Sequence, residues 1–210
     1  MTDYLDSTRE SWTTVAEAYA EEARNGLDFK PFSRAMLAVF AELVDGPVAD
    51  LGCGPGNTTA YLHKLGLDVF GIDLSPGMVA VARRAHPHLS FDVGTMTALD
   101  LPEGQLGGVL AWYSIVNTPP KDLPAVFAEF HRVLAPGGHL LIGFQVRTET
   151  RHITEGFGST VSLDFHRQPP ELVASLLRAA GFRMVAQLLR EPDDTERSQQ
   201  AHMLVKKDDF

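Results

Sequence analysis

Acidic residues and closely spaced glycines mark one stretch of the chain as a binding site for a nucleotide-like molecule. Gly52, Gly54 and Gly56 stand in the run ADLGCGPGNT, whose acidic residue is Asp50. Glycines at this spacing allow a sharp backbone turn and the close approach of a ligand. A helix that begins after the turn directs its free N–H groups and positive dipole end to the same place. Further along, Asp73 offers a carboxylate that can accept hydrogen bonds from both hydroxyls of a ribose.

The segments that position these residues alternate between strands and helices. Apolar runs predict one strand that begins at Val48 and further strands at 67–72, 89–93, 109–113 and 139–146. Helices are predicted between them at 58–65, 75–85 and 123–134. Near-continuous apolar strands separated by helices indicate a parallel sheet covered on both faces. A helix at 169–180 follows, and then strands at 182–190 and 202–206. A turn-rich linker joins these last two strands, which predicts that they are antiparallel neighbours.

The N-terminal part is expected to be helical. Apolar residues at spacings of three and four predict helices at 7–24 and 31–44, with Pro31 in the first turn of the second helix. We therefore expect residues 1–45 to form a helical lid on a core of residues 46–210, within one domain. Residues 147–160 are polar and without clear periodicity, and residues 161–165 predict only a short strand.

Composition indicates an ordinary globular protein. The 210 residues are 44% hydrophobic and 21% charged, and the formal net charge is −9. This acidic balance argues against general binding to a phosphate backbone. The single cysteine, Cys53, excludes an internal disulfide and fits a reducing compartment. No signal peptide is visible in the first residues, and no apolar run reaches the ~20 residues that a membrane span needs, so we expect a soluble, cytoplasmic protein.

Two classes of cofactor compete for the glycine turn. A dinucleotide fold favours the pattern G-x-G-x-x-G, but Asn57 stands at its third glycine position. This mismatch counts against a nicotinamide or flavin cofactor. A phosphate-binding loop is excluded more firmly, because the turn lacks the G-K-[ST] ending.

Three motifs together resemble the class I S-adenosylmethionine-dependent methyltransferase superfamily, in its small-molecule branch. They are DLGCGPGNT at 50–58, GIDLSPGM at 71–78 and HRVLAPGGHLLI at 131–142. The resemblance covers roughly residues 48–144. It implies an α/β, Rossmann-like, doubly wound fold with a seven-stranded, mostly parallel sheet and an antiparallel last strand. It also implies S-adenosyl-L-methionine as the cofactor.

The resemblance assigns roles around that cofactor. The Gly52 carbonyl would accept from the amine, the N–H groups of the turn and Thr58 would meet the carboxylate, and Asp73 would bind the ribose. Asp50 would order the loop from behind. Other expected cofactor neighbours are Gly54, Gly56, Leu74, Met78, Thr95, Met96, Tyr113 and Tyr19. Thr95 departs from the family pattern, which often has an acidic residue there. Trp12 and Tyr19 would form an aromatic lid or pack as ordinary helix residues.

The acceptor is expected beyond the carboxyl ends of the strands, near residues 113–117 and 147–166 and the N-terminal helix. Methyl transfer from a sulfonium is an in-line displacement that alignment and desolvation can accelerate. Asn117 stands where relatives in this branch often have histidine, so it could orient an acceptor but not act as a base. His152 and His166 are the first base candidates and Glu155 the third. No metal site is expected, because residues 112–114 supply no carboxylate.

The leading hypothesis is methyl transfer to oxygen, nitrogen or carbon of a small-molecule acceptor. A domain that binds the cofactor without catalysis, as a regulatory or partner subunit, is the alternative. A nicotinamide-dependent oxidoreductase ranks third. We expect a monomer or homodimer with no general nucleic-acid binding and no membrane association.

Overall fold

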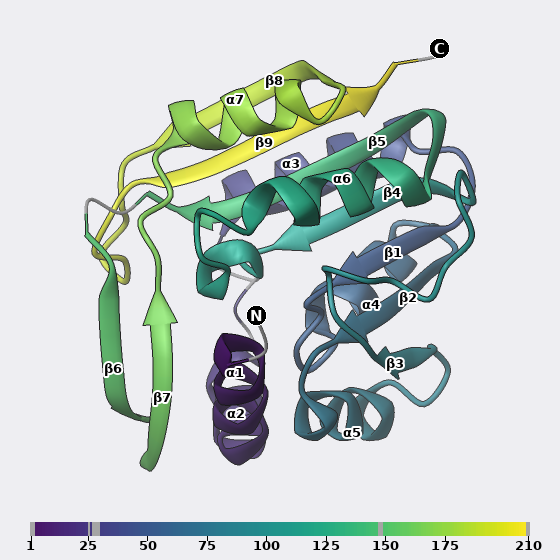
Figure 1. The fold of residues 1–210 in the computed structure, drawn as a ribbon. Helices are drawn as coiled ribbons and strands as arrows, with labels where there is room; N and C mark the ends of the chain where they lie inside the picture. Colours follow the sequence, from purple (N-terminus) through teal and green to yellow (C-terminus); the bar gives the residue numbers. More distant parts are fainter. Residues whose placement is uncertain (1–2, 25, 27–29, 147–148, 209–210) are drawn as a thin grey trace.

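Seven strands form one sheet in the order β3-β2-β1-β4-β5-β9-β8 (Figure 1). The computed structural model describes residues 3–24, 26, 30–146 and 149–208. The strands are β1 (Val48–Leu51), β2 (Val69–Asp73), β3 (Phe91–Val93), β4 (Leu106–Trp112), β5 (Leu134–Gln145), β8 (Phe182–Arg190) and β9 (Gln200–Lys207). The pairs among β1 to β5 are parallel, whereas β9 is antiparallel to both β5 and β8. The expected sheet, with its antiparallel last strand, is therefore confirmed.

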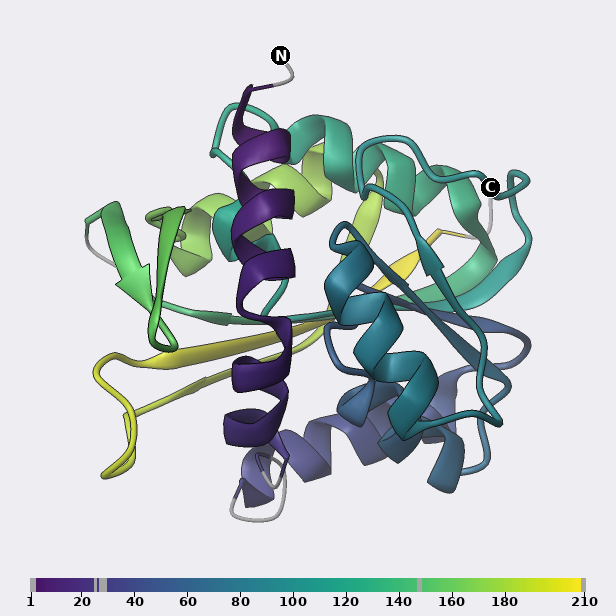
Figure 2. The same cartoon turned by 90° about the horizontal axis from the view of Figure 1, so that it is seen from below.

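Helices cover both faces of this sheet. They are α3 (Pro31–Leu43), α4 (Asn57–Lys64), α5 (Pro76–Ala85), α6 (Leu123–Val133) and α7 (Pro170–Ala179), with a short 3-10 helix η1 (Ile115–Asn117) after β4. Figure 2 shows α3 on one side of the sheet and α6 and α7 on the other. Leu110 packs with Leu37 and Phe40 of α3, whereas its neighbour Val109 packs with Phe127 of α6. This alternation along β4 follows from the two-residue period of a strand and makes the fold doubly wound.

The N-terminal segment forms two helices, α1 (Asp3–Thr14) and α2 (Ala16–Ala23), where one helix over 7–24 is expected from the sequence. Val15 separates them with a φ of −99° and a ψ of 5°. Its side chain is buried against Val161 and Leu163. Tertiary packing of this one residue thus interrupts a pattern that is helical on either side. Among the described residues, no helix combines the length and the apolar character needed to cross a membrane.

A separate two-stranded hairpin stands apart from the main sheet, beside α1 (Figure 1). It consists of β6 (Arg151–Gly156) and β7 (Ser159–Phe165) in antiparallel pairing. The expectation of irregular structure up to residue 160 is therefore wrong for β6, whose one large apolar residue, Ile153, gives no alternating signal. Residues 147 and 148 of that segment lie outside the described residues. The hydroxyls of Ser7 and Ser11 both donate to the carbonyl of Ser162, which fastens the hairpin to α1.

Candidate functional site

The glycine turn between β1 and α4 has the backbone that only glycine adopts freely. Gly52, Gly54 and Gly56 have φ values of +74°, +54° and +83°. A Cβ on Gly52 would lie 2.3 Å from Cβ of Ser114, so the turn packs directly against the end of β4. A Cβ on Gly54 would meet only Tyr19, at 3.9 Å. The Gly54 position thus faces open space into which a ligand fits.

Asp73 ends β2 beside this turn and already organises it. One carboxylate oxygen accepts from the N–H of Gly54 and the other from the N–H of Ser75, each at 2.8 Å. Burial raises the pKa of Asp73, and the two backbone hydrogen bonds oppose that rise. Each oxygen keeps a further lone pair. The carboxylate can therefore accept hydrogen bonds from a diol while it holds the turn in place.

Asp50 lies beneath the turn rather than in the open space. Its Oδ2 accepts a 2.7 Å hydrogen bond from Oγ1 of Thr59 in α4, and its Oδ1 is buried without a partner. Burial is the main cause that raises the pKa of Asp50, to about 7, with a further contribution from Asp73. Asp50 thus ties the turn to the helix that follows it and does not line the cavity described next.

One cavity of about 1010 Å³ extends from the glycine turn to the hairpin. It brings together thirteen of the residues proposed from the sequence: Trp12, Tyr19, Gly52, Gly54, Thr58, Asp73, Leu74, Met78, Thr95, Met96, Tyr113, Asn117 and Glu155. It does not include Asp50, Gly56, His152 or His166. Gly56 precedes α4 and faces inward, where an added Cβ would lie 2.8 Å from the ring of Phe91.

The cavity has two differently built halves. We call Gly52, Gly54, Asp73, Leu74 and Met96 the strand-end half, because they lie at or directly beyond the ends of β1, β2 and β3. The hairpin half consists of Trp12, Val116, Ile153, Phe157 and Phe165, which come from α1, η1 and the β6–β7 hairpin and its turn. A cavity of this size is at the upper end of the usual range for one drug-sized ligand. The two halves can hold a nucleoside-like molecule and a second small molecule side by side.

Aromatic rings gather where the two halves meet. Tyr19 of α2 lies edge-on to Trp12 and to Phe157, with ring centroids 5.2 and 5.3 Å apart. The ring of Tyr19 also packs near Met78 of α5, which lines the strand-end side. Trp12 and Tyr19 therefore do form part of the cavity wall, and Phe157 completes a cluster from three segments.

Asn117 holds the hairpin half together. Its amide oxygen accepts from the indole N–H of Trp12 at 3.1 Å, and its amide nitrogen donates to the carbonyl of Asp164 at 2.8 Å. The side chain is buried, with 9% of the residue exposed. One amide thus connects α1, η1 and β7 around the cavity.

The two histidines proposed as bases lie outside the cavity lining. His152 is about half exposed, and its Nδ1 lies 2.8 Å from Oδ1 of Asp164 on the neighbouring strand. His166 follows β7, and its backbone N–H donates to the carbonyl of Val116. Burial lowers the pKa of His166. The third candidate, Glu155 of β6, does line the cavity and is exposed.

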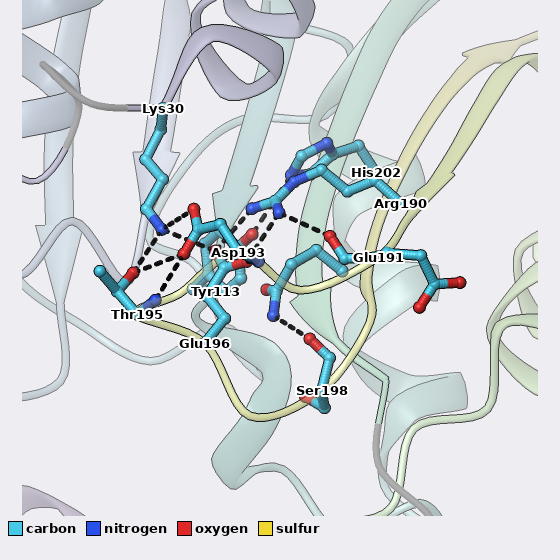
Figure 3. A network of polar contacts seen from close by, with 10 residues as sticks. Lys30, Tyr113, Arg190, Glu191, Asp193, Thr195, Glu196, Ser198 and His202 are labelled. Atoms are coloured by element: carbon cyan, nitrogen blue, oxygen red, sulfur yellow. Dashed lines mark hydrogen bonds and ion pairs between the residues drawn. The ribbon is translucent and has the colours of Figure 1, made fainter.

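A polar network closes the cavity on the side of the β8–β9 loop (Figure 3). Arg190 makes two parallel hydrogen bonds with Glu196, at 2.6 and 2.5 Å, and Nζ of Lys30 contacts Glu196 and Asp193 at 2.9 and 2.6 Å. Burial raises the pKa of Tyr113, and the nearby positive charge of Arg190 opposes that rise. This network joins the start of α3, the end of β4 and the β8–β9 loop.

Tyr113 stands at a strained position within this network. Its φ is +56°, and its hydroxyl lies 3.2 Å from Nε2 of His202. Burial lowers the pKa of His202 to about 4, so its ring is neutral at pH 7 and its Nε2 can accept a hydrogen bond from the Tyr113 hydroxyl. The ring of His202 stacks on Trp112 with centroids 4.8 Å apart. Tyr113 is thus held in place from two sides at the cavity edge.

Several residues of this site cannot be identified from the sequence alone. Phe157 has a left-handed φ of +51° at a turn whose only sequence signal is the following Gly158. Asp193 and Glu196 meet Lys30 across more than 160 positions of sequence, and no local pattern predicts such a contact. Ser114 has the one usable signal: a serine directly after a predicted strand at the same sheet edge as the glycine turn.

Comparison with known proteins places this site in a family. Residues 48–138 match the family model described as "Methyltransferase domain". Demethylmenaquinone methyltransferase of Beutenbergia cavernae is 30% identical over 182 residues, which cover 76% of this chain and 75% of that protein. The same-named protein of Chlorobaculum parvum is 36% identical, over 43% of this chain and 37% of its own length.

A solved structure shows the same fold. Burkholderia thailandensis 1,6-didemethyltoxoflavin-N1-methyltransferase, with bound 1,6-didemethyltoxoflavin and S-adenosylhomocysteine, superposes with a TM-score of 0.75 at 23% identity. That superposition covers 99% of this chain and 90% of the other. With the matches in sequence, it agrees with the motifs at the glycine turn and at Asp73. The chain belongs to the class I S-adenosylmethionine-dependent methyltransferase superfamily.

Proposed function

We propose that this methyltransferase transfers the methyl group to oxygen, nitrogen or carbon of a small molecule bound in the hairpin half of its cavity. The observation that carries the proposal is the continuity of one cavity of about 1010 Å³ from Gly54 and Asp73 to Trp12 and Phe157. The names of two similar proteins agree, since one is a demethylmenaquinone methyltransferase and the other a 1,6-didemethyltoxoflavin methyltransferase.

The strand-end half fits the cofactor by its own features. Gly54 leaves open space, and Asp73 offers carboxylate oxygens with unused lone pairs. We propose that Asp73 accepts from the ribose hydroxyls, that Gly52 and Thr58 meet the amino-acid end, and that Leu74, Met78 and Met96 pack on the adenine. S-adenosylmethionine supplies a methyl group already activated on a sulfonium.

The chain's own side chains contribute to catalysis by aligning the acceptor with the methyl group and by excluding water. Trp12, Tyr19 and Phe157 cover the junction of the two halves, so the N-terminal helices act as a lid. Asn117 sets the position of that lid through its hydrogen bonds to Trp12 and Asp164. A proton released by the acceptor can pass to solvent or to Glu155, which lines the cavity.

Two measurements test this function. Thermal shift should show stabilisation by S-adenosylmethionine and S-adenosylhomocysteine and none by NAD, because ligands stabilise only the state that binds them. Labelled S-adenosylmethionine, incubated with the protein and a cell extract, should place label in the small-molecule fraction. Binding of the cofactor with no transfer would favour the non-catalytic alternative. Label confined to protein or nucleic acid would contradict a small-molecule acceptor.

A further inference from the structure

We infer that the acceptor is a flat, largely apolar molecule without net charge, and that Phe157 is a residue that selects it. This inference rests on the proposed function, because it names the class of acceptor for the same cavity. It is carried by three observations: the aromatic walls of the hairpin half, the cancelling charges around it and the strained backbone of Phe157.

The walls of the hairpin half favour an aromatic acceptor. The rings of Trp12, Tyr19 and Phe157 lie within 5.2 to 6.3 Å of one another, and all three line the cavity. Val116 and Ile153 add further apolar surface. Aromatic rings attract other rings beyond the burial of area alone, through stacked and edge-to-face contacts. A flat ring system therefore gains more from this wall than a puckered molecule of the same size.

The charges around this half cancel. Arg151 and Glu155 are the only charged residues that α1, η1 and the hairpin contribute to the lining within the described residues. Both come from β6 and line the cavity together with Ile153. Both are exposed, one of each sign. Lys30 and Glu196, which line the opposite side, are already paired. The two charges of opposite sign leave this wall without net charge, which favours a neutral acceptor over an anionic one.

Phe157 occupies a backbone conformation that its side chain disfavours. Its φ of +51° is followed by +74° at Gly158, in the two-residue connection between β6 and β7. Such a turn favours Asn-Gly or Gly-Gly, and a bulky residue with positive φ is uncommon. Strained residues of this kind cluster at ligand-binding positions. The strain here places an aromatic ring over the junction between cofactor and acceptor.

Calorimetry on the complex with S-adenosylhomocysteine tests the inference with three probes of one skeleton. 2-Naphthol is flat and neutral, decahydro-2-naphthol has the same carbon skeleton but is puckered, and 2-naphthyl phosphate is flat and anionic. We expect 2-naphthol to bind about tenfold more tightly than either of the others. Phe157→Leu keeps apolar bulk without the ring and should weaken 2-naphthol about threefold or more, with decahydro-2-naphthol unchanged. Phe157→Tyr should restore the preference.

Each contrary result would overturn a different part of the proposal. Equal affinity for the flat and puckered probes, tighter binding of the phosphate, or no binding of 2-naphthol would overturn the inference and leave the cofactor site intact. An unchanged preference in Phe157→Leu would overturn the role of Phe157. If S-adenosylhomocysteine itself does not bind, the proposed function and this inference both fail. Extraction of labelled product separates them further, since label in a charged small molecule refutes only the flat neutral acceptor.

Discussion

The two halves of the cavity are specified in different ways. The strand-end half is built by short segments that each turn at the end of a strand, and Gly54 meets Asp73 across only 19 positions. The hairpin half is assembled over long distances: Trp12 reaches Asn117 across 105 positions, and Ser11 reaches Ser162 across 151. The first half suits a ligand that never changes, the cofactor. The shape of the hairpin half can vary through small changes in packing, which a site for different acceptors requires.

Filling the strand-end half should have the largest effect. Gly54→Val places a branched side chain in open space at a φ of +54°, so we expect at least a hundredfold loss of affinity for S-adenosylhomocysteine by calorimetry. Gly104→Val is the matched control, because Gly104 has a φ of +67° and nothing within 4 Å of an added Cβ. It should suffer similar backbone strain and bind normally. A folded Gly54→Val protein that still binds would place the cofactor elsewhere.

Removal of the Asp73 carboxylate should be the next largest effect. Asp73→Ala deletes charge-assisted hydrogen bonds and should weaken S-adenosylhomocysteine by about 2 kcal/mol or more, roughly thirtyfold. The control is Asp92→Ala on the adjacent strand β3, whose carboxylate pairs with Arg83 at the surface. Calorimetry should find the control unchanged. Equal affinities for wild type and Asp73→Ala would refute the ribose role.

The strand-end half shows which features of a site can be predicted from local sequence. Positive φ at Gly52, Gly54 and Gly56 and the carboxylate after β2 follow from glycine spacing and strand periodicity, which are properties of a few neighbouring residues. The individual strands and helices of residues 48–146 and 170–207 also follow from apolar patterns, and the seven-stranded sheet that the resemblance implies is confirmed. The hairpin is not predictable in this way, because β6 carries one large apolar residue among exposed polar ones.

Contacts between distant segments are also out of reach of local patterns. The Lys30–Glu196–Arg190 network and the aromatic cluster around Phe157 depend on how complete elements dock. The break at Val15 has the same origin, since a helical pattern yields there to packing against β7. The candidate bases show the same limit. Residue type alone favours His152 and His166 as bases, whereas the tertiary structure places both outside the cavity lining.

A variant in the hairpin half should separate the two halves functionally. Asn117→Ala leaves the Trp12 indole and the Asp164 carbonyl without their partner, which should lower the free energy of unfolding in urea by about 1–3 kcal/mol. Affinity for S-adenosylhomocysteine should change less than twofold. His152→Ala is the control on the same hairpin. It breaks only a surface pair with Asp164 and should cost less than about 1 kcal/mol. A loss of cofactor affinity as large as that of Asp73→Ala would show that the halves are not independent.

The smallest effect concerns the support beneath the glycine turn. The pKa of Asp50 is about 7 in the folded protein and near 3.8 when unfolded. The folded state therefore binds the extra proton between these values, and its stability falls as pH rises toward and through 7. Between pH 6 and pH 7, wild type should lose about 1 kcal/mol more than Asp50→Asn in urea titrations. Parallel pH profiles for the two proteins would contradict a buried, raised Asp50.

The structure of the complex with S-adenosylhomocysteine tests the division of the cavity most directly. We predict that the ribose hydroxyls lie within hydrogen-bonding distance of Asp73, with the amino-acid end against Gly52 and Gly54. The sulfur should then face Trp12 and Phe157, with the hairpin half left for the acceptor. A cofactor whose ribose contacts residues other than Asp73, or whose sulfur faces away from the hairpin half, would contradict this account.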